Sequence, residues 1–421
     1  MTGLIVLALY IALFTAAYFF VRLTKWLGRP NRDFTSLKTV TFGDESAIRP
    51  DRAASVISVL VIFLIWGAFT GSKWVPFHVP GPFVGDTSFG YTVENAAGES
   101  DSATVTVRVH EVGENAQNPE IAEKSGIAQN DADTVGAWRS TLIKVTGNDA
   151  GEGLVVTAID GTPITPGETV AVAHGTVTMT PKGSLNFQPD KGLQMEPIWM
   201  PPPEDVLHRL KEIASDGYQN YTLWEHLGSS LMRVLAGFFL GALAGIPLGY
   251  AMGLSGWFRG WFDPIVEFMR PVPPLALIPL VIIWFGIWET GKIVLLFLAA
   301  LWVMTIAARA GVSGVNISKV HAAYSLGASK RQVLWHVIVP NSLPEIFTGA
   351  RVAMGVCWGT VVAAELVAAQ KGAGMMIIAA SKFQLTDIVL MGIILIGIIG
   401  YGIDILMRMA EARLVPWKGR I

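Results

Sequence analysis

Long apolar runs are the feature that most limits what this chain can fold into. They lie at 3–22, 54–70, 230–254, 272–287, 292–308, 346–369 and 386–407. A helix needs about 20 predominantly apolar residues to cross the hydrocarbon core of a bilayer. The whole chain is 52% hydrophobic and only 15% charged, which is unusual for a soluble enzyme. We therefore predict a polytopic α-helical membrane protein with about seven spans.

Basic residues indicate how the first spans are oriented. No Lys or Arg precedes the run at 3–22, whereas Arg22, Lys25 and Arg29 follow it. A secretory signal peptide shows the reverse pattern. Because cytoplasmic loops carry an excess of Lys and Arg, we expect the loop at 23–53 to be cytoplasmic. The next run then crosses outward.

The segment 71–196 has no apolar run and differs in composition from the rest of the chain. Apolar and polar residues alternate there, between turns rich in Gly, Pro, Asn and Asp. The clearest alternating positions are Phe89, Tyr91, Val93, Val105, Val107 and Val109. Many short strands between turns are typical of an immunoglobulin-like sandwich. We predict an all-β domain that is inserted after the span at 54–70 and lies outside the cytoplasm.

The amino-acid sequence of this segment resembles bacterial cadherin-like repeats. Residues 85–109 resemble the closing strands of such a repeat, and residues 145–190 resemble its opening strands. The reversed order predicts one circularly permuted sandwich. Between these parts, Asn130, Asp131 and Asp133 are candidates for a calcium site, because hard cations take clustered carboxylates. The plainer interpretation of the three residues is a solvated turn.

The long polar segment between the apolar runs at 292–308 and 346–369 predicts two short helices. The first helix ends at Gly327, a residue suited to the left-handed position after a helix. Ser329 and Gln332 have the spacing of a capping box, which starts the second helix. We expect Pro340 and Pro344 to end it. Such a bent pair is a compact surface for docking a partner.

These residues resemble the EAA signature of ABC-importer permeases, in which the loop couples the permease to a cytoplasmic ATPase. The resemblance implies a coupling loop at 321–340 made of His321, Ala322, Ala323, Leu326, Gly327, Ala328, Ser329, Val337 and Pro340. One departure is His321, which stands where the family usually has Glu. The alternative is an ordinary amphipathic loop helix between two spans.

The resemblance extends over residues 197–421, which look like the taurine, nitrate and alkanesulfonate permeases. The blocks PIWMPPPEDVLHRLKEI, DPIVEFMRPVPPLALIPL and TGARVAMGVCWGTVVAAELVAA carry it in order. It implies a six-helix permease core that begins with the span at 54–70, so the helix at 1–22 is extra. The implied location is the bacterial cytoplasmic membrane. The implied partners are an ABC ATPase dimer, a periplasmic or lipoprotein substrate-binding protein, a second copy of the chain and membrane lipid.

No motif predicts catalysis by this chain. Residues 286–292 (GIWETGK) contain Gly-x4-Gly-Lys, but Ile293 replaces the Ser or Thr that a phosphate-binding loop needs for magnesium. We therefore expect no enzyme activity, no cofactor and no nucleic-acid partner here. ATP and magnesium are expected in the partner ATPase.

Ionisable residues inside spans are functional candidates because burying them in a bilayer is unfavourable. For Glu365 we favour structural pairing within the permease, with a role in the translocation pathway as the alternative. Met354, Cys357 and Trp358 are pathway candidates for which helix packing is an equal alternative. Asp404 and Arg408 have the spacing of an i,i+4 ion pair.

The sequence therefore predicts the permease subunit of an ATP-driven importer for taurine, an alkanesulfonate, nitrate or a similar small anion. It would work by alternating access, in which ATPase closure switches the open side of a homodimer. The rival function is a membrane-anchored envelope adhesion or sensor protein that works through its β-sandwich. That alternative explains residues 71–196 but leaves the later spans without a purpose.

Overall fold

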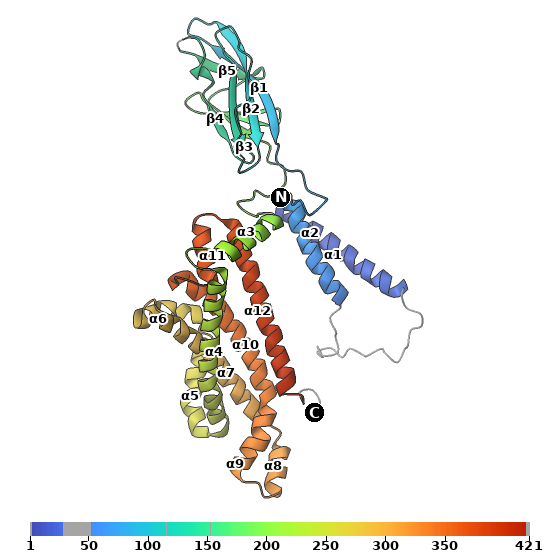
Figure 1. Cartoon of the computed structure of the whole chain (residues 1–421), viewed down its shortest axis with the longest axis vertical. Helices are drawn as coiled ribbons and strands as arrows, with labels where there is room; N and C mark the ends of the chain where they lie inside the picture. The colour runs from blue at the N-terminus through green and yellow to red at the C-terminus, as the bar shows by residue number, and fades with distance from the viewer. Residues whose placement is uncertain (1, 28–51, 115, 152, 418–421) are drawn as a thin grey trace. The chain divides into compact units, whose positions relative to one another are not determined.

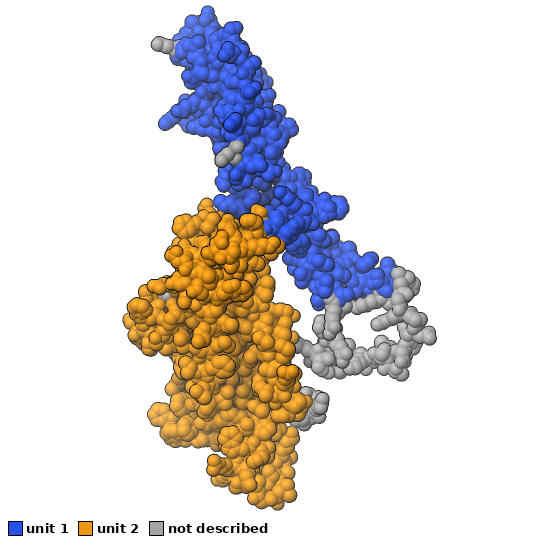
Figure 2. Space-filling model, in the orientation of Figure 1, with its two compact units in different colours: residues 1–204 blue, residues 205–421 orange. Residues whose placement is uncertain are grey.

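The computed structural model describes residues 2–27, 52–114, 116–151 and 153–417. The chain divides into two compact units, residues 1–204 and residues 205–421 (Figure 2). All described strands fall in the first unit and within the predicted segment 71–196. The predicted basic loop at 23–53 lies mostly outside the described residues.

Two apolar helices begin the first unit. They are α1 (Thr2–Leu27) and α2 (Arg52–Thr70), so the first helix extends past the predicted end at residue 22. Buried Val61 and Phe69 of α2 belong to a small cluster against which Tyr10 and Leu13 of α1 pack. The two helices therefore form a hairpin with its own apolar contact.

The strands of the first unit form two sheets (Figure 1). The first sheet has the order β3-β2-β1-β5-β6, with β1 (Gly85–Glu94), β2 (Ser100–His110), β3 (Asp131–Gly136), β5 (Val155–Ile159) and β6 (Thr162–Pro163). The second has the order β4-β9-β8-β7, with β4 (Thr141–Ile143), β7 (Thr169–Val172), β8 (Gly175–Met179) and β9 (Leu185–Pro189). Within the sheets β2 and β3 pair in parallel, and the other neighbours are antiparallel.

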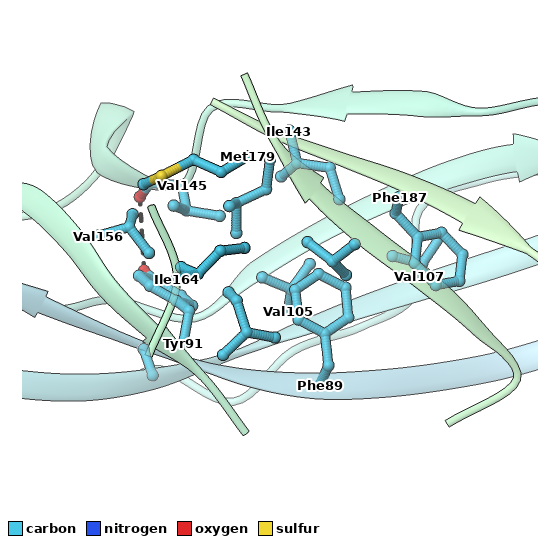
Figure 3. Close-up of a cluster of buried hydrophobic side chains, with 14 of the residues drawn as sticks. Phe89, Tyr91, Val105, Val107, Ile143, Val145, Val156, Ile164, Met179 and Phe187 are labelled. Carbon is cyan, nitrogen blue, oxygen red and sulfur yellow. Dashed lines mark hydrogen bonds between the residues drawn. The ribbon is translucent and has the colours of Figure 1, made fainter. Parts of the chain in front are cut away.

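One hydrophobic core serves both sheets (Figure 3). Phe89 of β1 stacks on Phe187 of β9 with ring centroids 5.8 Å apart, which joins the two sheets. Buried and less buried residues alternate along β1, β2, β8 and β9, as a period of two requires when one face is packed. The alternation predicted from the sequence is therefore confirmed in these strands.

The two cadherin-like segments belong to one fold. Strand β1 pairs with β2 along its whole length and also with β5, where Tyr91 lies opposite Ile159. A hairpin that paired only with itself would have contradicted the predicted single domain, and this is not what the structure shows. The immunoglobulin-like class and the circular permutation remain predictions.

Asp131 makes the stability of this domain depend on pH. One carboxylate oxygen of Asp131 is buried and has no hydrogen-bond partner among the described residues. Burial raises the pKa of Asp131 from 3.8 to about 6, and the nearby charge of Asp149 adds to the shift. The folded state therefore binds this proton more tightly than the unfolded state, so the free energy of unfolding falls as pH rises from about 4 to about 6.

We expect Asp131→Asn to flatten this pH dependence and to raise the domain's stability at neutral pH. The slope that it removes is bounded by about 1.4 kcal/mol per pH unit, the limit for one titrating group. Calorimetry of the full chain in detergent between about pH 4 and pH 7 measures the effect. Glu94→Gln, at an exposed position of β1, is the control. An unchanged slope in Asp131→Asn would contradict the assignment.

The second unit is helical. Its elements are α3 (Pro203–Asp216), α4 (Leu223–Leu254), α5 (Gly256–Met269), η4 (Pro274–Leu277), α6 (Ile278–Phe285), α7 (Glu289–Ser313), α8 (Ile317–Ser325), α9 (Lys330–Val333), η5 (Leu334–Ile338), α10 (Val339–Ala368), α11 (Ala373–Lys382) and α12 (Thr386–Leu414). Among the described residues of both units together, five helices are long and apolar enough to cross a membrane. The number is six if one bent pair of helices counts as a span. The predicted total of seven remains a prediction.

The apolar residues at 272–287, predicted as the fourth span, form the second arm of a bent helix pair. Residues 256–269, predicted as a loop, form α5, and the chain then bends by 93° into residues 274–285. Pro271, Pro273 and Pro274 lie at the bend. Proline has no backbone N–H and its ring clashes with the preceding helical turn, so three prolines in four positions interrupt the helix.

The predicted end of the helix that starts after Ser329 was also wrong. The chain continues from α9 through the π-helical turn η5 into α10, without a break at Pro340 or Pro344. Pro340 lies in the first turn of α10, and it has no N–H to donate to the preceding turn. The wider π-turn before it accommodates the change in hydrogen bonding.

Close packing of α4 on α7 organises the second unit. Gly237, Gly241, Gly245 and Gly249 recur every four residues on the buried face of α4. A Cβ at Gly245 would meet the Leu301 carbonyl oxygen at 2.7 Å, and the other three positions are equally crowded by α7. Small residues at this spacing let two helix backbones approach closely.

Candidate functional site

The loop between α7 and α10 is a rigid helix-bend-helix. Helix α8 is capped by Asn316, whose side chain accepts from the Ser318 N–H. It ends in a Schellman motif: Gly327 N donates to Tyr324 O at 2.9 Å, and Ala328 N donates to Ala323 O at 3.0 Å. Gly327 has φ +82°, the left-handed conformation that this motif requires. The predicted end of the first helix is confirmed.

The second short helix of the loop starts as predicted. The Ser329 side chain accepts from Gln332 N, and the Gln332 side chain accepts from Ser329 N at 2.8 Å, which is the reciprocal capping box. Val333 is buried beneath this turn. A cap at each side of the bend leaves little freedom between α8 and α9.

The predicted coupling residues are mostly on the surface of this loop. The exposed ones are His321, Ala322, Leu326, Gly327 and Ser329. Ala323, Ala328, Val337 and Pro340 are half-buried. Leu326 is 88% exposed, so an apolar side chain stands at the tip of the bend without cover from the described chain.

The base of the loop is tied to the start of α10. Lys319 Nζ donates to Asn341 Oδ1 at 2.9 Å, and Trp417 Nε1 donates to Pro340 O at 3.2 Å. Motion of a partner bound at the bend would therefore be transmitted to α10. This arrangement suits a mechanical connection better than a flexible tether.

The pathway candidates lie on α10 and differ in their surroundings. Met354, Cys357 and Trp358 all belong to the buried core of this unit. Cys357 packs against α7, with Sγ 3.5 Å from Leu296 O. Met354 and Trp358 also line a cavity of about 250 Å³ between α10 and α12, which Cys357 does not. Trp358 Nε1 donates to Ile396 O at 3.1 Å.

Charged groups line one side of this cavity. Arg351 Nε donates to Asp404 Oδ1 at 3.2 Å, and Arg408 forms the predicted i,i+4 ion pair with Asp404 at 2.5 Å. Glu411 adds a second carboxylate near Arg351, at 3.7 Å. The predicted pair therefore belongs to a larger cluster that holds α10 against α12.

Glu365 is the centre of a buried polar network at the opposite end of α10. Its side chain is fully buried and pairs with Arg233 of α4 at 2.6 Å. Ser230 Oγ donates to Glu365, and Gly374 N donates to Oε2 at 3.0 Å. Glu365 therefore forms a structural ion pair between α4 and α10, and its alternative role in the translocation pathway remains a prediction.

Arg233 connects this network to a third helix. It donates two hydrogen bonds to Glu289 of α7, at 2.5 and 2.8 Å, in the bidentate geometry that Arg favours. A further bond runs from Arg233 to Lys371 O at 2.9 Å. Lys292 also pairs with Glu289 at 3.0 Å. One guanidinium therefore joins α4, α7, α10 and the turn that leads to α11.

Arg233 was not among the predicted site residues, although the sequence carries a signal for it. His226, Ser230 and Arg233 are polar residues at i, i+4 and i+7 of an otherwise apolar helix, and all three are buried. Such spacing places them on one face. His226 Nδ1 meets the backbone of Gly372, so the whole stripe faces the α10–α11 turn.

The calcium candidates do not gather into a metal site. Asn130 accepts from Thr104 N, and Asp133 accepts from Thr141 Oγ1 at 2.6 Å. Within the described ranges, no group of three or more His, Cys, Asp or Glu side chains is arranged to hold a metal ion. Asn130 and Asp133 instead connect neighbouring strands and turns.

The comparisons with known proteins concern the second unit. Residues 237–416 match the family described as binding-protein-dependent transport system inner membrane component. The taurine transport system permease protein TauC of Escherichia coli is 50% identical over 228 residues, which cover 54% of this chain and 83% of that relative. The putative aliphatic sulfonates transport permease protein SsuC of Escherichia coli is 37% identical, over 52% of this chain and 82% of that relative.

More distant relatives and a solved structure cover the same part. The nitrate import permease protein NrtB of Synechococcus elongatus is 31% identical, over 46% of this chain and 67% of that relative. A structure of the MetNI methionine ABC transporter in an inward-facing conformation is similar at 19% identity and a TM-score of 0.39, covering 45% of this chain and 92% of that one. The identity to TauC over most of its length settles the family: the chain is a multi-pass inner membrane protein that belongs to the binding-protein-dependent ABC transporter permeases.

Proposed function

We propose that this chain is the permease subunit of an importer for a small anion of the taurine, alkanesulfonate and nitrate group. The observation that carries this function is the capped bend at 317–333, an exposed rigid surface in a chain of the permease family. The names of the relatives support the substrate class, and the 50% identity to TauC favours a sulfonate within it.

In the proposed assembly, partner proteins supply ATP hydrolysis and substrate delivery. Two ATPase subunits, which hold ATP and magnesium, contact residues 321–340 of two copies of this chain. A substrate-binding protein delivers the anion on the outer side, where we also place residues 71–196. Closure of the ATPases moves α10 through the base of the loop, because Lys319 of α8 is bonded to Asn341 of α10. Access then alternates between the two sides of the membrane.

Reconstitution of the permease in vesicles with its ATPase and binding protein tests this proposal. We expect ATP-dependent uptake of taurine, ethanesulfonate or nitrate. A variant in which a short Gly-Ser linker replaces residues 85–189 should keep that uptake, since the strands lie outside the family match. No uptake of any of these anions, with retained binding of an envelope protein through residues 85–189, would favour the adhesion or sensor function.

A further inference from the structure

A hollow of about 490 Å³ lies beside α11 in the second unit. Helix α11 is at the end of this unit opposite to α8 and α9 (Figure 1). Four parts of the unit line it: the turn before α4, the α6–α7 turn, the end of α10, and α11. Ligand pockets for small molecules typically range from about 300 to 1,000 Å³. The hollow is therefore large enough for a small organic ion with part of its water.

The charge of this hollow is positive. Glu365 and Lys382 are the two charged residues that line it. Glu365 belongs to a cluster in which Arg233 and Lys292 balance Glu365 and Glu289, and both oxygens of Glu365 are hydrogen-bonded. Lys382, an exposed residue in the last turn of α11, has no ion-pair or hydrogen-bond partner in the described part of the chain. One uncompensated ammonium group thus remains at the rim.

Two amide side chains, Gln219 and Gln370, complete the polar part of the lining. Gln219 has φ +52° and Asn220 has φ +65°, in a tight turn closed by two backbone bonds between Tyr218 and Tyr221. Such turns prefer Gly, Asn or Asp, because other residues resist positive φ. A Gln held there at a conformational cost suggests that its side chain has a use.

The remaining lining is apolar and includes Ile287, Val367 and Phe383. An ammonium group and two amide donors beside apolar side chains match a small anion with a short carbon chain. We propose that the hollow is a weak receiving site for a small organic sulfonate or carboxylate, with Lys382 as its charge partner and Gln219 and Gln370 as hydrogen-bond donors. This inference rests on the proposed function, which places the hollow on the outer side of the membrane.

Weak binding is what such a site requires. A solute that enters a pathway must be held favourably enough to arrive and loosely enough to leave. A single exposed ammonium provides this, whereas the buried Arg233 is fully used by two carboxylates. Specificity would still come from a binding protein, and the hollow would select only the sign of the charge.

Thiol labelling of the purified full-length chain tests the site without transport. Val367→Cys places a thiol in the lining at a position that is 62% exposed, while the single native cysteine, Cys357, is buried. The measured quantity is the rate at which the thiol reacts with 2-sulfonatoethyl methanethiosulfonate and with the corresponding trimethylammonium reagent. Each rate is divided by the rate of the same reagent with a free thiol in solution. The sulfonate reagent should react at least about fivefold faster, the size of effect expected for one nearby charge in water. Millimolar taurine or ethanesulfonate should slow it.

Three variants in the Val367→Cys background decide the outcome. Lys382→Gln should abolish the preference for the sulfonate reagent, and Lys382→Arg should keep it. Lys371→Gln, which removes a neighbouring charge that lies over the Tyr221 ring, should leave it unchanged. A preference that survives Lys382→Gln, or that falls equally in Lys371→Gln, would overturn the inference.

Uptake measurements separate this inference from the proposed function. If vesicles import taurine but the labelling shows no dependence on Lys382, the importer stands and the receiving site fails. If labelling depends on Lys382 but no anion is imported, the site stands as an anion site and the importer fails. In a working importer, Lys382→Gln should lower the uptake rate without lowering ATPase association.

Discussion

Replacing Arg233 by methionine is expected to lower the free energy of unfolding of the second unit by about 3–5 kcal/mol, the usual effect of breaking a buried ion pair. The change would leave Glu365 charged and fully buried, with Ser230 and Gly374 as its remaining hydrogen-bond donors. Glu289 would lose both hydrogen bonds from the guanidinium. Unfolding in mixed detergent micelles, followed for wild type and variant, measures the loss.

Two comparisons test the cause of this loss. Arg259→Met removes an exposed arginine that lies 3.8 Å from Asp263, and it should cost less than about 1 kcal/mol. The double variant Arg233→Met with Glu365→Met should recover much of the stability, because no buried charge is then left unpaired. If Arg233→Met is as stable as wild type, the buried network does not contribute to the free energy of unfolding.

Gly327→Val is expected to separate the permease from its ATPase. Valine is β-branched, and an L-residue in the left-handed conformation costs about 1–2 kcal/mol relative to a right-handed one. A Cβ at Gly327 would meet no atom within 4 Å, so the effect must come from the backbone and not from crowding. The Schellman motif would open, and the direction of α9 relative to α8 would change. We expect at least a tenfold loss of ATPase co-purification and of transport-linked ATP hydrolysis.

Gly327→Asn is the matched control for this change. Asparagine tolerates positive φ, so this variant should keep most of the coupling while adding a side chain of similar size. Both variants should insert into the membrane in normal amounts, since the bend is exposed and lies outside the packed core. Equal defects in the two variants would show that the bend tolerates no side chain, and that backbone geometry is not the reason.

Sequence reasoning succeeded where the cause of a structure lies within a few residues. The capping box at Ser329, the Gly327 bend and the Asp404–Arg408 pair each depend on groups at most five positions apart. The alternation in β1 and β2 identified the face of the sheet that is buried.

It failed where two local signals compete. Pro340 was expected to end a helix, but it lies in the first turn of α10, after a π-turn. Pro271, Pro273 and Pro274 were expected within a loop or at the start of a span, but they form a sharp bend between two helices. A proline shows where an N–H is missing, and only the surrounding packing determines whether the chain stops, bends or continues.

The sequence by itself determined the membrane class and the local geometry of the loop at 321–340, because these follow from composition and from contacts at short range. It indicated the family through the resemblance of several motifs in order. The tertiary structure alone brought Arg233 to Glu289 and Glu365, which stand 56 and 132 positions away. It also separated Met354 and Trp358, which line a cavity, from Cys357, which packs against α7. The physical reason is that ion pairs and cavities depend on how helices are placed against one another, and the placement follows from packing that no single segment encodes.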